Sequence, residues 1–190
     1  MSDTQRVIIT GEIGVGKTTF CSRIAELGRQ AGLALAGLIS PGVFEGGRKV
    51  GISVISLKKK ETRLLAKPRE VKTSGPSTKG WSFKEESVQW GNRVLAQTAP
   101  CDLLIVDELG PLEFERGEGW VEGLTLIDKG RFGVAFVVVR PYLVPQALER
   151  WPAAHTIKLT SESDIPHLAK ETFQRYKKND FPGSSFFYHT

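Results

Sequence analysis

Apolar and polar positions follow one another along this chain in a succession that predicts strands alternating with helices. Short, mostly apolar runs predict strands at residues 7–10, 35–40, 103–106, 133–139 and 156–159. Apolar residues spaced three or four positions apart predict amphipathic helices at residues 17–30, 84–98, 119–128, 143–150 and 164–176. Because buried strands that alternate with helices form parallel sheets covered on both faces, we expect an α/β fold with a doubly wound, mostly parallel sheet.

Residues 42–66 depart from this succession and predict an antiparallel β-hairpin inserted into the fold. The pair Gly46-Gly47 suits a tight primed turn, and residues 50–57 alternate with period two. Residues 62–66 are expected to add a short edge strand. The segment 68–79 is polar and punctuated by Pro and Gly, so we expect a mobile loop there that is a candidate lid.

The composition is that of an ordinary globular chain, with 190 residues of which 40% are hydrophobic and 25% charged. We therefore expect one domain over residues 1–176 and a tail at 177–190, whose aromatic end is a candidate to dock on the body or on a partner. No apolar run approaches the roughly 20 residues of a membrane helix, and the N-terminus lacks the apolar core of a signal peptide. These features predict no membrane partner and a cytoplasmic location.

The net charge of +5 leaves room for an acidic partner, and much of the excess lies in the basic segment 58–84. This segment lacks a helix-turn-helix pattern, a known RNA-binding motif and regularly interleaved aromatic residues. A solvated basic surface is therefore the favoured interpretation, although nucleic-acid binding stays open and some of these cations are candidates to serve a bound phosphate group.

A phosphate-binding loop occupies the turn between the first predicted strand and the first predicted helix. It fits the pattern G-x4-G-K-[ST] with the residues Gly11, Glu12, Ile13, Gly14, Val15, Gly16, Lys17, Thr18 and Thr19. Its glycines allow successive backbone N–H groups to turn inward at the helix N-terminus and surround an anion. Lys17 is then expected to reach the β- and γ-phosphates, and Thr18 to offer its hydroxyl to Mg²⁺. The sequence predicts binding of a nucleoside triphosphate.

Two acids follow the apolar run 103–106 and strengthen this prediction. Parallel strands deliver the residues at their carboxyl ends to the edge of the sheet where open α/β folds bind ligands. Asp107 is expected to hold Mg²⁺ or one of its waters opposite Thr18, and Glu108 to orient or deprotonate the attacking water. The alternative is that both acids simply end a strand. The Gly-Pro pair at 110–111 is expected to break the chain after them.

The order of these motifs resembles the small P-loop nucleoside-triphosphatases of bacteria and archaea that include the human cancer-related nucleoside-triphosphatase. Four segments carry the resemblance: the phosphate loop, Gly46 to Gly51 on the hairpin, Lys79 to Phe83, and the run Asp107-Glu108-Leu109-Gly110-Pro111-Leu112-Glu113. Together they span most of the chain to about residue 170. The resemblance implies slow, Mg²⁺-dependent hydrolysis of several nucleoside triphosphates.

The resemblance also implies roles for single residues. Glu108 matches the acid that acts on the attacking water, and Glu113 matches a second acid nearby. Arg48 matches a hairpin arginine that meets phosphate charge in the transition state. The candidate catalytic residues are therefore Lys17, Glu108, Arg48 and Glu113. For Glu113 a helix-entry or solvated position stays open, and for Arg48 a solvated hairpin tip.

Two departures from the family pattern concern the base and turnover. Where the family has Glu-Val-Arg before the hairpin turn, this chain has Gly42-Val43-Phe44, and the Asn-Arg near the last strand is replaced by Glu162-Ser163. Trp81 and Phe83 are candidates to stack on a base, but packing in the core or a loop is the commoner role of such residues.

Three functions fit these motifs. The first is a nucleoside-triphosphatase that acts on ATP, GTP and other nucleoside triphosphates. The second is a nucleotide-gated adaptor that binds a protein partner through its basic hairpin-to-lid region or its aromatic tail. The third, supported only by a shared phosphate loop and size, is a small-molecule kinase.

Overall fold

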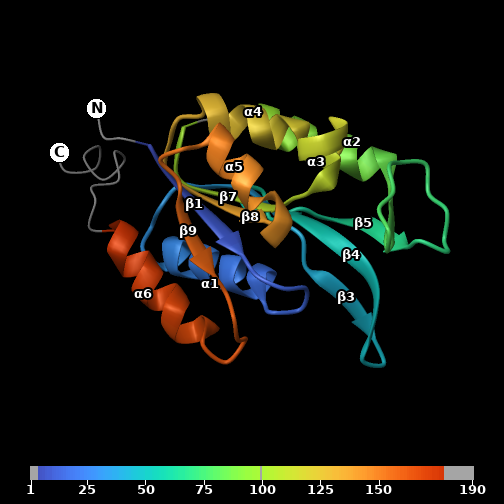
Figure 1. Ribbon diagram of the computed structural model, residues 1–190, viewed down its shortest axis with the longest axis horizontal. Coiled ribbons are helices and arrows are strands. Elements are labelled where there is room, and N and C mark those ends of the chain that lie inside the picture. Colours follow the sequence, from blue (N-terminus) through green and yellow to red (C-terminus); the bar gives the residue numbers. More distant parts are fainter. Residues whose placement is uncertain (1–3, 99, 178–190) are drawn as a thin grey trace.

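A single twisted sheet crosses the middle of the molecule, and helices cover both of its faces (Figure 1). The computed structural model describes residues 4–98 and 100–177. Within them the strands are β1 (Gln5–Thr10), β2 (Leu35–Ile39), β3 (Gly42–Glu45), β4 (Arg48–Ser56), β5 (Thr62–Pro68), β6 (Trp81–Phe83), β7 (Cys101–Leu109), β8 (Phe132–Val139) and β9 (His155–Lys158). The helices are α1 (Lys17–Gln30), α2 (Glu85–Ala96), α3 (Pro111–Arg116), α4 (Val121–Lys129), the 3₁₀ turn η1 (Pro141–Leu143), α5 (Val144–Arg150) and α6 (Ile165–Lys177).

The sheet has a parallel half and an antiparallel half. Its order is β6-β5-β4-β2-β7-β8-β1-β9, with β2, β7, β8, β1 and β9 parallel to one another. β4 joins β2 in the antiparallel sense, β3 continues alongside β4, and β5 and β6 follow beyond it. The doubly wound, mostly parallel sheet and the inserted antiparallel hairpin are thus confirmed. β5 differs from expectation, because β6 pairs with its outer side and it is not an edge strand.

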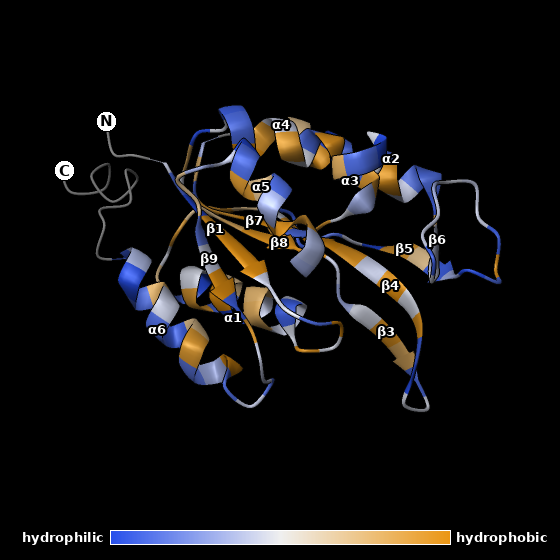
Figure 2. Ribbon diagram, in the orientation of Figure 1, coloured by the Kyte–Doolittle hydropathy of each residue, from blue (hydrophilic) through white to orange (hydrophobic). Residues whose placement is uncertain are grey.

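Successive side chains of the central strands pack into two separate hydrophobic cores, one on each face of the sheet. Ile8 of β1 packs among the residues under α2, α4 and α5, whereas its neighbours Val7 and Ile9 pack under α1 and α6. All three are fully buried. Figure 2 shows the result, with apolar β1, β7 and β8 in the middle and polar residues on the outer faces of the helices. Because these strands are covered on both faces, the middle of each is a continuous apolar run.

The helix that follows the loop segment packs as its periodicity predicts. Val88, Trp90 and Leu95 of α2 are all buried against the sheet. On the other face, α1 lies against α6, and Phe20 and Ile24 of α1 are fully buried there. The strand–helix alternation therefore fixes α1, with the phosphate loop at its start, against the sheet.

Two short elements differ from expectation. The Gly110-Pro111 pair, expected to break the chain, instead starts α3, because proline lacks an N–H group that the first helical position does not need. β6 has only three residues, too few for any period to show. Both elements lie beside the candidate site, one after β7 and the other next to β5.

The segment between β5 and β6 is tied to its surroundings. The hydroxyls of Thr73 and Ser82 lie 2.8 Å apart, Arg69 donates to the Thr78 carbonyl at 2.6 Å, and Arg116 donates to the Ser77 carbonyl at 2.8 Å. Its role as a lid stays a prediction. The aromatic end of the tail lies outside the described residues. Within those residues, no helix is both long and apolar enough to cross a bilayer.

Candidate active site

The phosphate loop joins β1 to α1 in a conformation that depends on its glycines. Gly11, Gly14 and Gly16 have φ angles of +148°, +84° and +90°. A Cβ atom at Gly16 would lie 2.2 Å from Cδ1 of Ile165, and one at Gly11 would lie 2.5 Å from the carbonyl oxygen of Leu159. The loop therefore needs glycine both for its backbone angles and for its close packing against the segment between β9 and α6.

Helix α1 begins without a side-chain cap and with no acid in its first turn. The N–H groups at its start, which include those of Lys17 and Thr18, are thus left to an external acceptor. Glu12, Ile13 and Gly14 at the outer part of the loop are exposed, and Ile13 keeps 90% of its surface in solvent. Val15 is partly buried against the core under α1, and Thr19 is exposed. This geometry suits an anion at the helix N-terminus.

Lys17 folds over the loop that precedes it. Its Nζ donates hydrogen bonds to the carbonyl oxygens of Gly11 at 2.7 Å and Glu12 at 2.8 Å. Burial lowers the pKa of Lys17, while the charges of Glu108 and Asp107 act to raise it. The ammonium group is therefore bonded to the phosphate loop and lies near the two acids at the carboxyl end of β7.

Asp107 is the buried member of this acid pair. Its Oδ2 accepts the backbone N–H of Ser40 at 3.1 Å, and the Thr18 side chain lies near enough to its carboxylate to lower the pKa of Asp107. Burial raises the pKa of Asp107 to about 6, partly offset by the hydrogen bond from Ser40. The structure thus brings Asp107 and Thr18 together, as expected of a carboxylate and a hydroxyl that share one hard cation.

Glu108 lies at the surface of the site and contacts an arginine that the sequence analysis did not single out. Its Oε1 accepts a hydrogen bond from Nε of Arg140 at 2.6 Å, and about one third of each side chain is exposed. Arg140 follows β8, which pairs directly with β7. The sequence does show a cation directly after the apolar run 133–139. Linking this cation to Glu108 requires knowing that the two strands are neighbours in the sheet.

Both carboxylate oxygens of Glu113 accept hydrogen bonds from backbone N–H groups. Oε2 accepts from the N–H of Gly110 and Oε1 from the N–H of Trp120, each at 2.7 Å. Burial raises the pKa of Glu113 to about 7, although these hydrogen bonds lower it. The side chain therefore joins the start of α3 to the start of α4, which favours the helix-entry alternative over contact with a reacting group.

The two cations at the start of β4 differ in their surroundings. Arg48 is exposed at the hairpin, and its side chain makes no hydrogen bond or ion pair within the described part of the chain. The next residue, Lys49, places its Nζ 4.9 Å from the centre of the Trp81 ring. Burial lowers the pKa of Lys49, opposed by the charges of Glu108 and Asp107. The Lys49 side chain is exposed, yet it lies close enough to the acid pair for both charges to act on it. Sequence analysis missed it because the alternation of a strand does not tell which of two neighbours faces a ligand.

The aromatic candidates for base stacking have packing roles. Trp81 and Phe83 of β6 are partly buried and pack against the core under α2. The Lys49 ammonium group lies over the Trp81 ring. These contacts favour packing, the alternative that the sequence analysis left open.

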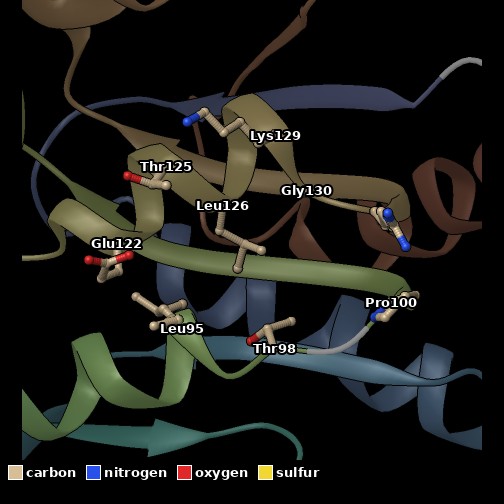
Figure 3. Close-up of a pocket in the computed structure, with 10 residues that line it drawn as sticks. Leu95, Thr98, Pro100, Glu122, Thr125, Leu126, Lys129 and Gly130 are labelled. Carbon is tan, nitrogen blue, oxygen red and sulfur yellow. The ribbon is translucent and has the colours of Figure 1, made fainter.

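A shallow groove lies at the opposite edge of the sheet and belongs to another part of the molecule. It has a volume of about 280 Å³ and is lined by the ends of α2 and α4 and the residues before β7 and β8 (Figure 3). Thr98, Glu122, Lys129 and Arg131 are among its polar lining residues. Since it adjoins the amino ends of the strands, it is separate from the site at their carboxyl ends.

A family model described as NTPase matches residues 6–161 of the chain, which include every candidate site residue. Among curated proteins, the nucleoside-triphosphatase THEP1 of Caldivirga maquilingensis is 32% identical over 111 residues, or 58% of this chain and 62% of that protein. The protein of the same name from Methanocaldococcus jannaschii is 33% identical over 112 residues, or 58% of this chain and 64% of that protein. The chain thus spans about three fifths of the length of the curated relatives it matches.

Two solved structures have the same fold. The solution structure of a human cancer-related nucleoside triphosphatase superposes with a TM-score of 0.72 at 18% identity, covering 93% of this chain and 99% of that one. The crystal structure of THEP1 from the hyperthermophile Aquifex aeolicus gives a TM-score of 0.66 at 18% identity, covering 91% and 99%. These structures confirm the architecture that the sequence motifs predict.

Proposed function

The chain belongs to the NTPase family, and we propose on that basis that it is a Mg²⁺-dependent nucleoside-triphosphatase that converts ATP, GTP and other nucleoside triphosphates to the diphosphate and phosphate. The observation that carries this proposal is the position of Lys17 between the phosphate loop and the acid pair Asp107 and Glu108. A triphosphate bound on the loop amides would present its terminal phosphate to these groups.

The donors present suit Mg²⁺. Asp107 and Thr18 offer one carboxylate and one hydroxyl, which lie next to each other. Mg²⁺ is commonly held by one or two protein oxygens, with substrate phosphates and waters as its other ligands. When bound, the ion would neutralise charge on the phosphate oxygens.

The proposed step is an attack of water on the γ-phosphorus. The water oxygen forms a bond to phosphorus, the bond between phosphorus and the β,γ-bridging oxygen breaks, and the nucleoside diphosphate leaves with that electron pair. Glu108 orients the water and accepts its proton, with Arg140 holding the carboxylate in place. Lys17 contacts the β- and γ-phosphates through this change.

Hydrolysis of nucleotides with different bases is expected, because the groups at the site contact the phosphate end of the nucleotide. The groups assembled at the site, namely the loop amides, Lys17, Asp107 and Glu108, all address phosphates, water or metal. The segment with Glu162 adjoins Gly16 and is the candidate neighbour of the base. A cytoplasmic location, a protein partner and contact of segment 58–84 with nucleic acid stay predictions.

The test is phosphate release from ATP, GTP, CTP and UTP with Mg²⁺, using the wild type, Lys17→Ala and Glu108→Gln. We expect release from several nucleotides by the wild type and at least a hundredfold loss in both variants. Glu108→Gln should still bind nucleotide, whereas Lys17→Ala should bind it weakly. Tight binding by the wild type without release would contradict the proposal and support the adaptor or kinase alternative.

A further inference from the structure

One cation beside the acid pair is not part of the phosphate loop. Lys49 comes from β4, in the antiparallel half of the sheet, whereas Lys17, Asp107 and Glu108 come from the parallel half. β4 extends beyond β2, because Ile55 pairs with Ile39 at the end of β2 while the residues before position 53 continue alongside β3. The hairpin therefore carries Lys49 past the carboxyl edge of the sheet, where the phosphate loop also lies.

Packing on two sides holds the Lys49 side chain. Its ammonium group lies 4.9 Å from the centre of the Trp81 ring, a cation–π contact. Its Cε passes so close to Gly42 that a Cβ atom there would lie only 2.8 Å away. Gly42 stands where the family pattern has Glu, so the absence of a side chain at this position leaves room for the lysine.

The charges around Lys49 are those of the acid pair. Both Glu108 and Asp107 act on the Lys49 ammonium group, and the same two carboxylates act on Lys17. Lys49 has no carboxylate partner in a salt bridge within residues 4–98 and 100–177. An exposed cation that lies near two acids without pairing with either is available to an anion brought between them.

We infer that Lys49 contacts the terminal phosphate of the bound nucleotide from the side opposite the phosphate loop, with Trp81 as the residue that positions it. This inference rests on the proposed function. Lys49 supplies the positive charge on the hairpin side that an arginine supplies in many nucleoside-triphosphatases. It adds to the ammonium group of Lys17 on the loop side, so the triphosphate lies between two lysines.

The experiment compares Lys49→Met and Lys49→Arg with the wild type in two assays, phosphate release and binding of ATP and ADP in the presence of Mg²⁺. We expect Lys49→Met to lower kcat at least tenfold and ATP affinity by a similar factor, with ADP affinity changed less than twofold. Lys49→Arg should restore most of the loss. Lys59→Met, which removes an exposed lysine in the turn at the other end of β4, is the matched control and should leave both assays unchanged.

Two further variants test the surroundings. Trp81→Leu should lower kcat and ATP affinity less than Lys49→Met does, because the lysine keeps its charge and loses only its packing partner. As in Lys49→Met, the affinity for ATP should fall more than the affinity for ADP. Arg48→Met should lower kcat less than Lys49→Met does, and the reverse order would overturn the inference. If Lys49→Met lowers the affinities for ATP and ADP by the same factor, the inference is also overturned.

The outcomes separate this inference from the proposed function. A wild type that binds ATP but releases no phosphate contradicts the hydrolase, yet the ATP-to-ADP affinity ratio of Lys49→Met still decides the role of Lys49. A wild type that hydrolyses ATP together with a fully active Lys49→Met supports the hydrolase and overturns the inference. A wild type that binds neither nucleotide overturns both.

Discussion

Nε of Arg140 lies 2.6 Å from Oε1 of Glu108, which is in β7, and Arg140 directly follows the neighbouring parallel strand β8. Val139 and Leu109, which adjoin them, are partners across the β7–β8 ladder. The position of the Glu108 carboxylate thus depends on the pairing of two buried strands. A proton acceptor held in this way keeps one orientation toward the attacking water.

Replacing Arg140 should therefore slow turnover without abolishing nucleotide binding. We expect Arg140→Leu to lower kcat tenfold to a hundredfold, because a misplacement of about 1 Å at a reacting group has effects of that size. Arg140→Lys should recover only part of the loss, since lysine lacks the Nε donor geometry. Steady-state phosphate release measures both.

Arg150→Leu is the matched control for these variants. Arg150 also pairs with a carboxylate, that of Asp128, but on α5 and α4 away from the acid pair. Turnover should be unchanged in this variant. A loss equal to that of Arg140→Leu would show a general effect of removing surface arginines and would contradict a role for Arg140 in orienting Glu108.

The requirement for Mg²⁺ should depend on pH through Asp107. Burial raises the pKa of Asp107 to about 6, so this carboxyl takes up a proton in a range where an ordinary aspartate stays ionised. Because a metal ligand must lose its proton, the Mg²⁺ concentration for half-maximal activity should rise as pH falls below 6, approaching tenfold per pH unit. Titrations of Mg²⁺ at pH 5, 6 and 8 measure this. A half-maximal concentration that is constant over this range would contradict the assignment of Asp107.

Glu113 should make folding stability depend on pH in the opposite sense to a salt-bridged acid. Burial raises the pKa of Glu113 from 4.5 to about 7, so between these values the folded chain binds more protons than the unfolded chain. Stability due to this group is then greatest at low pH and falls as pH rises toward 7, by on the order of 3 kcal/mol for a shift of this size.

Urea unfolding from pH 5 to pH 8 tests this dependence. Glu113→Gln should flatten the decline, because the amide does not ionise. Glu115→Gln, at an exposed position of the same helix, should keep the slope of the wild type. Identical slopes in all three proteins would mean that Glu113 does not titrate in this range.

Gly37 in the middle of the sheet should tolerate no side chain. Its φ angle is +104°, and a Cβ atom there would lie 1.9 Å from the carbonyl oxygen of Ile105 in β7. Gly37→Ala should therefore cost more than about 3 kcal/mol in unfolding free energy, since the backbone of β2 or of β7 at Ile105 must move. Gly46→Ala, at a positive φ with open space around it, should cost only about 1 kcal/mol. Thermal or urea unfolding of both variants compares them, and equal costs would contradict the close packing of β2 on β7.

The sequence predicted the parts of the site that depend on local pattern. The phosphate loop follows from glycine spacing between a strand and a helix, and the placement of Asp107 beside Thr18 follows from the carboxyl edge of a parallel sheet. Sheet and helices were predictable in the same way, because their buried faces impose a period on the chain. β6 and α3 were missed because three to six residues are too few to show one.

Arg140 and Lys49 were missed for a different physical reason. The pairing of Arg140 with Glu108 requires that β8 lie next to β7, and strand order is not written in local periodicity. Lys49 reaches the site through the length of the hairpin and a contact with Trp81, about thirty residues away. Both are long-range relationships, in which the sequence supplies the residue and the tertiary fold supplies its partner.

The close packing of the phosphate loop affects how the chain folds during its synthesis on the ribosome. Gly11 and Gly16 are near the start of the chain, yet they pack against Leu159 and Ile165 near its other end. The loop therefore leaves the ribosome well before the residues that pack against it have been made. Contacts between such distant residues form slowly, since a long stretch of chain must first be closed. A nascent chain therefore contains the phosphate-loop residues long before it contains the residues that pack against the loop and hold its conformation.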